Sequence, residues 1–185
     1  MSKVSDDLKQ HSEVRAALTC GEAFQRVVEE FIPMISSIKV ESSKAMSNEL
    51  GDIVGCAANL AFAIELYLKA LLILLGLNVP QVHNLRDLYD KIPQAVRELI
   101  ESVYEKAWPD QVRRLHGYVS VTLAKGPLEK PLWDDYTKKP LALPDLLARS
   151  KNLFQSWRYI FEFRQPNDSS YQFHQIEYGL LWYAA

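Results

Sequence analysis

The stretch from Ile53 to Leu77 constrains the fold of this chain more than any other feature. It is apolar on nearly every helical face and ends at Gly76, with Pro80 soon after. Glycine and proline at these places are typical stop signals of a helix. A helix that is apolar nearly all round must be covered by other helices. The stretch therefore predicts a central helix, from about residue 48 to 75, in a helical core.

The same stretch is long enough to cross a bilayer, which takes about 20 residues. However, Asn59, Glu65 and Lys69 lie inside it, and ionisable groups near the middle of a lone span are costly. We therefore expect no membrane span. Residues 1–18 are charged and lack the apolar core of a signal peptide, so we expect a cytoplasmic protein.

Composition predicts a single helical domain over residues 1–185. The chain is 48% hydrophobic and 24% charged, which is ordinary for one soluble domain. Its net charge of -2 argues against coating nucleic acid through a broad basic surface. We expect a mobile N-terminus at 1–18, a long proline-rich loop at 125–143 and no strands. Apolar spacing of three and four residues predicts helical segments at about 21–38, with a kink or end at Pro33, and at 48–75, 83–91, 93–106, 109–124, 144–163 and 171–185.

The two cysteines, Cys20 and Cys56, lack the close Cys or His neighbours of a metal site or a redox motif. We expect two inert core thiols rather than a disulfide. No phosphate-binding, dinucleotide-binding or metal-ligand motif is present in the sequence. The prediction is no metal and no cofactor.

A polar cluster is predicted around the central helix. Glu65 and Lys69 are four residues apart, so they share one helix face. Spacing alone favours a modest surface pair, whereas a buried helix favours an ion pair that fixes how a partner helix docks. His83, followed by Asn84 as a helix cap, is either a structural hydrogen-bonding group or points toward Glu65. Arg158 either pairs with a surface acid or reaches Glu65 across the bundle. We interpret Glu65, Lys69, His83 and Arg158 as an architectural cluster lining a small cleft.

These residues stand in a recognisable order. Glu65-x-x-x-Lys69-Ala-Leu-Leu, a glycine turn, His83-x-Leu-x-x-Leu and a late Arg158-Tyr159 helix together resemble HEPN domains. The resemblance is strongest at about 57–93 and weaker at 146–164. It implies an all-α bundle of about five to six helices that frequently dimerises. It also implies a place in prokaryotic defence, toxin-antitoxin or nucleotide-handling systems, in many members associated with RNA.

The sequence departs from the catalytic members of that family. HEPN ribonucleases carry an arginine followed, after four to six residues, by a histidine. Here Arg113 and Arg114 lie too close to His116, and Arg164 lies too far from His174. We therefore predict a non-catalytic binding or assembly module, with no assigned catalytic residue.

Two alternatives stay open. One is a divergent metal-independent ribonuclease, for which His83, His116 and His174 are weak candidates although His83 has no arginine at the required distance upstream. The other is a nucleotide-binding module.

Residues 106–139 are mildly basic and interleaved with aromatic side chains. Arg113, Arg114, Trp133 and Tyr136 there form a candidate patch for RNA or a partner protein. A solvated surface or a dimer contact suits the same composition. We expect a homodimer.

Overall fold

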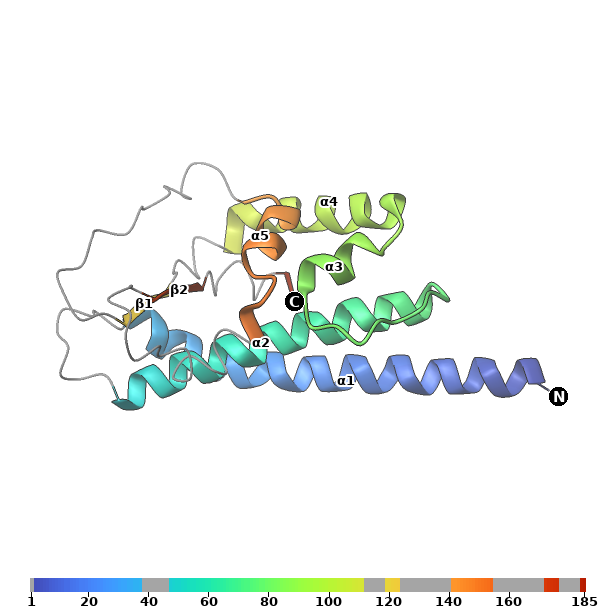
Figure 1. Ribbon diagram of the computed structural model, residues 1–185, viewed down its shortest axis with the longest axis horizontal. Helices are drawn as coiled ribbons and strands as arrows, with labels where there is room; N and C mark the ends of the chain where they lie inside the picture. Colours follow the sequence, from blue (N-terminus) through green and yellow to red (C-terminus); the bar gives the residue numbers. More distant parts are fainter. Residues whose placement is uncertain (1, 38–46, 112–118, 124–140, 155–171, 177–183) are drawn as a thin grey trace.

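The computed structural model describes residues 2–37, 47–111, 119–123, 141–154, 172–176 and 184–185 (Figure 1). Within these ranges the chain has five helices and one pair of antiparallel strands. The helices are α1 (Ser2–Ser37), α2 (Ser47–Leu74), α3 (Leu85–Asp90), α4 (Gln94–Gln111) and α5 (Leu143–Arg149), and the strands are β1 (Val119–Leu123) and β2 (Gln172–Ile176). The fold is all-α in class, as the sequence predicts, with a small strand pair added.

The central helix is confirmed. α2 lies along α1, which runs in the opposite direction (Figure 1). Ten apolar residues in the described part of α2 are buried, spread over more than one of its faces, as expected for a helix that is apolar nearly all round. They are Ile53, Cys56, Ala57, Leu60, Ala61, Ala63, Ile64, Leu68, Ala70 and Leu72.

The shorter helices α3 and α5 pack together and cover the core from the other side of α2 (Figure 1). Asn84 caps α3 as predicted, because its side chain accepts hydrogen bonds from the backbone amides of Arg86 and Asp87. The buried side chains of these two helices join the α2 core, and they are Leu85, Leu88 and Tyr89 in α3 and Leu143, Leu146 and Leu147 in α5.

Several predicted boundaries are wrong. α1 begins at Ser2 rather than near residue 21, so segment 1–18 is almost wholly helical, and α1 continues through Pro33. A proline removes one backbone donor, and Pro33 lies only four residues before the helix ends. α4 likewise passes through Pro109 as one helix. α5 ends at Arg149, because the backbone leaves the helix at Ser150, so the helix predicted over 144–163 is interrupted. Helical residues resume at Leu153 and Phe154, and residues 155–163 lie outside the described residues.

The two strands are the second correction. β1 occupies residues predicted as the end of a helix at 109–124, and β2 occupies the start of one predicted at 171–185. They pair antiparallel, with Val121 opposite His174. Each strand therefore pairs the backbone groups along one of its edges with a segment far away in the sequence. Most of the predicted loop at 125–143 lies outside the described residues.

Among the described helices, α2 is long and apolar enough over Gly51–Leu74 to cross a membrane by length and composition. Half of that stretch is buried inside the fold. The core helix of a soluble protein shows the same pattern, so the absence of a membrane span stays a prediction.

Candidate functional site

The carboxylate of Glu65 is the centre of the predicted cluster. Its side chain is 2% exposed, in the middle of α2. Lys69 donates a hydrogen bond from Nζ to Glu65 Oε1 at 2.6 Å. His83 Nδ1 lies 3.1 Å from Oε1 and 3.0 Å from Oε2. Both carboxylate oxygens are therefore engaged by groups of the same chain, as a buried charge requires.

Local structure explains how these three side chains meet. Lys69 follows Glu65 by one helical turn and lies on the same face. After α2 ends at Leu74, Gly76 adopts a positive φ of 67°, a conformation that glycine takes without steric cost. The chain then turns back toward α2 before α3 begins at Leu85. This return places His83 beside a carboxylate 18 positions earlier in the sequence.

The hydrogen bonds also assign the tautomer of His83. A carboxylate accepts hydrogen bonds and cannot donate them, so Nδ1 must carry the proton. In the neutral ring Nε2 is then an acceptor. The His83 side chain is 47% exposed, whereas that of Lys69 is 19% exposed. His83 is thus the member of the cluster most open to a ligand.

The structure brings together three of the four predicted cluster residues. Arg158 lies outside the described residues, as do the patch residues Arg113, Arg114, Trp133 and Tyr136 and the candidate His116. His174 lies in β2, paired with β1 rather than with α2. The geometry of Glu65, Lys69 and His83 is as predicted for a ring pointing at Glu65. Their functional role stays a prediction.

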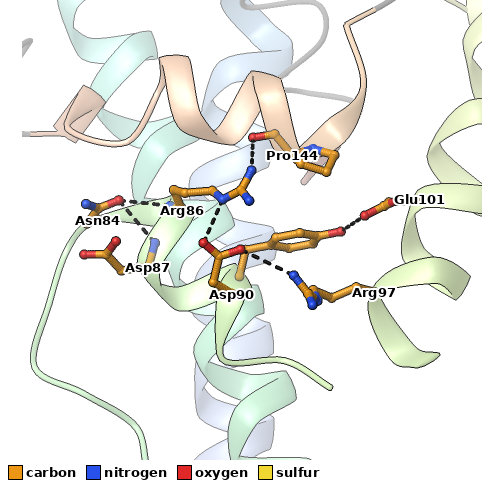
Figure 2. Close-up of polar contacts among 8 residues, drawn as sticks. Asn84, Arg86, Asp87, Asp90, Arg97, Glu101 and Pro144 are labelled. Carbon is orange, nitrogen blue, oxygen red and sulfur yellow. Dashed lines mark hydrogen bonds and ion pairs between the residues drawn. The ribbon is translucent and has the colours of Figure 1, made fainter. Parts of the chain in front are cut away.

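A second polar network, not predicted from the sequence, joins α3 to α4 and α5 (Figure 2). Arg86 donates from Nε to Asp90 Oδ2 at 2.8 Å and from Nη1 to the carbonyl of Pro144 at 2.8 Å. Arg97 of α4 reaches Asp90 Oδ1 at 3.4 Å. The hydrogen bond to Asp90 raises the pKa of Arg86 above its ordinary value. The four-residue spacing of Arg86 and Asp90 was a visible signal of part of this network.

Tyr89 completes this network from inside the core. Its side chain is fully buried, and its hydroxyl donates a hydrogen bond to Glu101 of α4. Burial, and then the hydrogen bond to Glu101, raise the pKa of Tyr89 above its ordinary value. The guanidinium of Arg97 lies 5.7 Å from the centroid of the Tyr89 ring, within the range of a cation–π contact.

The two cysteines differ from each other. Both are free thiols, but Cys20 is exposed, so the prediction of two core thiols is wrong for it. Position 20 lies on the outer face of α1, a helix whose start the sequence did not reveal. Cys56 is buried, and burial raises the pKa of its thiol to about 11. In the described part of the chain, no group of three or more His, Cys, Asp or Glu side chains is arranged to hold a metal ion.

The family model of the HEPN domain matches residues 39–122. The match spans α2, α3 and α4 and contains the whole cluster of Glu65, Lys69 and His83. Residues 39–122 are therefore similar to HEPN domains, and the resemblance seen in the sequence is confirmed for this stretch. A HEPN domain points to a nucleotide-related, RNA-related or defence function. No curated protein and no solved structure matches the chain.

Proposed function

We propose that this chain is a non-catalytic binding or assembly module of an RNA-linked, defence or toxin-antitoxin system, acting in the cytoplasm as a homodimer. The HEPN match supports the coarse class of this function. The observation that carries the non-catalytic reading is the burial of Glu65, whose two oxygens are both occupied by Lys69 and His83.

A reacting carboxylate must reach its substrate, and the Glu65 side chain is 2% exposed. Its hydrogen bonds instead tie the last turns of α2 to the segment that precedes α3. This arrangement suits a structural joint that fixes how α3 docks on α2. The sequence also lacks the arginine and histidine spacing of the catalytic family members. Both observations favour binding over cleavage.

The test is to incubate the purified protein with fluorescently labelled single-stranded and structured RNA in EDTA. Anisotropy should report binding, and electrophoresis should show intact RNA. Light scattering at micromolar concentration should show a dimer. An RNA that stays free at all protein concentrations would overturn RNA binding, and a monomer would overturn the dimer.

A divergent metal-independent ribonuclease is the second candidate function. The observation that favours it is the Nε2 atom of His83, an acceptor on a half-exposed ring whose other nitrogen is held by Glu65. Such a nitrogen has the character of a general base. Cleavage in EDTA that is lost in His83→Gln would support this candidate, and intact RNA would exclude it. Calorimetry with ATP, NAD and cyclic nucleotides tests the nucleotide-binding alternative.

A further inference from the structure

Four rings from four segments of the chain form a continuous row that ends at His83. Phe24 of α1 meets Phe62 of α2 edge to face, with ring centroids 4.8 Å apart. Phe62 stacks on Phe154, which follows α5, at 5.5 Å and an interplanar angle of 26°. Phe154 in turn lies 5.5 Å from the His83 ring at 32°. The three phenylalanines are partly buried, and His83 is exposed, so the row lies along the surface.

The His83 ring is held from two directions. Phe154 lies toward one face of the ring, and Glu65 holds the Nδ1 edge. Of the side chain, 47% is nevertheless exposed, so a large part of the ring stays open to solvent beside these two contacts. A ring fixed in this way loses little further rotamer freedom when a second planar group stacks on it.

The charged pair beside the ring does not repel a polyanionic ligand. Glu65 alone would repel phosphate, but Lys69 is bound to the same carboxylate oxygen and brings the pair to zero net charge. Stacking of bases on aromatic rings is one of two means by which proteins bind single-stranded nucleic acid without reading its sequence, and positive charge along the backbone is the other. A planar base therefore fits the open ring face better than an aliphatic side chain does, since the Nε2 edge is polar.

We propose that the exposed face of His83 is a stacking platform for a nucleobase of single-stranded RNA, with Phe154 and Phe62 as the rigid support behind it. This inference rests on the proposed function for the class of its ligand. Glu65 is then a positioning residue that sets the orientation of the ring.

Two substitutions at His83 separate stacking from a merely structural role. His83→Phe keeps an aromatic ring but loses the hydrogen bond to Glu65. His83→Asn keeps a donor for Glu65 but loses the ring. Stacking predicts that His83→Phe binds a short oligoadenylate nearly as tightly as the unaltered protein, whereas His83→Asn binds about 5- to 100-fold more weakly. A structural role predicts the reverse order.

Three controls complete the experiment. An abasic strand of the same length should bind the unaltered protein and His83→Asn equally, because it offers phosphate without bases. His11→Asn, at an exposed histidine of α1, should leave oligoadenylate affinity unchanged. Circular dichroism and thermal melting should show that both His83 variants are folded. If either His83 variant is unfolded, Phe154→Leu replaces it in the test. This substitution should weaken oligoadenylate binding while leaving His83 in place.

The experiments distinguish a failure of this inference from a failure of the proposed function. If RNA binds but His83→Asn and Phe154→Leu retain full affinity, the platform is wrong and the function stands. If no RNA binds, adenosine monophosphate is titrated while the His83 ring is followed by NMR, with ribose 5-phosphate as the control. Ring-current shifts with the nucleotide alone would keep the platform and reject the RNA-linked function. No shift would reject both.

Discussion

Gly21 of α1 lies directly against the ring of Tyr67 in α2. A Cβ atom added at Gly21 would come within 2.7 Å of Tyr67 Cε1. The tyrosine hydroxyl donates a hydrogen bond to Oε1 of Gln25 at 2.9 Å, so the ring is held in place from the same helix. The two longest helices thus approach each other at a position that has room for hydrogen and no larger group.

Replacing Gly21 with alanine should therefore destabilise the fold. Alanine favours a helix over glycine by about 1 kcal/mol, but overpacking a fitted contact costs about 1–3 kcal/mol. The free energy of unfolding in urea should fall by up to about 2 kcal/mol. Gly55→Ala is the matched control, because Gly55 is exposed in α2 with no atom within 4 Å of the added Cβ. That change should stabilise by about 0.5–1 kcal/mol. Equal effects of the two changes would contradict the close contact.

Glu65→Ala should leave Lys69 and His83 without their shared acceptor. Loss of one partner from a buried pair costs about 3–5 kcal/mol, and the partial exposure of Lys69 and His83 reduces this to about 2–3 kcal/mol. Urea unfolding measures the loss. Glu13→Ala, at an exposed i,i+4 pair with Lys9, should change stability little. The architectural assignment of the cluster is wrong if Glu65→Ala leaves both stability and RNA or partner binding unchanged.

The two thiols should differ in reactivity. Cys20 is exposed, whereas Cys56 is buried with its pKa raised to about 11. Thiolates are the reactive form, so a disulfide reagent should label Cys20 quickly in the native protein and Cys56 slowly. Both should react quickly in urea. Cys20→Ser should abolish the fast phase, and its persistence would place the reactive thiol at Cys56.

Stability should fall as the pH rises above about 9. The Cys56 thiol loses its proton near pH 9 in the unfolded chain but only near about 11 in the folded one. Between these values the unfolded state binds fewer protons, so the free energy of unfolding decreases with pH. Burial also raises the pKa values of Tyr67 and Tyr89, which act in the same direction. Urea unfolding across this range should show a smaller decrease for Cys56→Ala than for the unaltered protein. An equal decrease would show that the thiol does not contribute.

Arg86→Lys should loosen α5. The guanidinium bridges Asp90 and the Pro144 carbonyl with two different nitrogens, a fork that a single ammonium does not reproduce. Because the side chain is partly exposed, we expect a loss of about 0.5–1.5 kcal/mol. Hydrogen exchange should become faster at residues 143–149. Arg26→Lys, at an exposed position of α1, should leave that exchange unchanged. Unchanged exchange in Arg86→Lys would mean that other contacts hold α5.

The central helix and most of the cluster were predictable because both depend on local spacing. The apolar period of α2 marks a buried helix, and four-residue spacing puts Glu65 and Lys69 on one face. The approach of His83 was predicted only as one of two alternatives. It depends on the path of the chain after Gly76. The sequence signals a turn there, but it does not determine the direction that the chain takes after the turn.

The missed elements depend on distant partners. β1 and β2 pair Val119 with Ile176, and no local signal sets such a register. The first half of α1 was missed because it is largely polar. Among the described side chains from position 9 to position 20, Val14 is the buried one. Contact with α2 supports this part of the helix, since Gln10 donates to the carbonyl of Ile73 at 2.5 Å.

The antiparallel packing of α1 on α2 has a consequence for what counts as the folding unit. The stretch that matches the HEPN family begins at residue 39, after α1 has ended. Yet Phe62 and Tyr67 of the matched stretch pack on Phe24 and Gly21 of α1. A fragment trimmed to the matched residues would leave that face of α2 bare and prone to self-association. The boundary of family likeness and the boundary of independent folding are therefore different places in this chain.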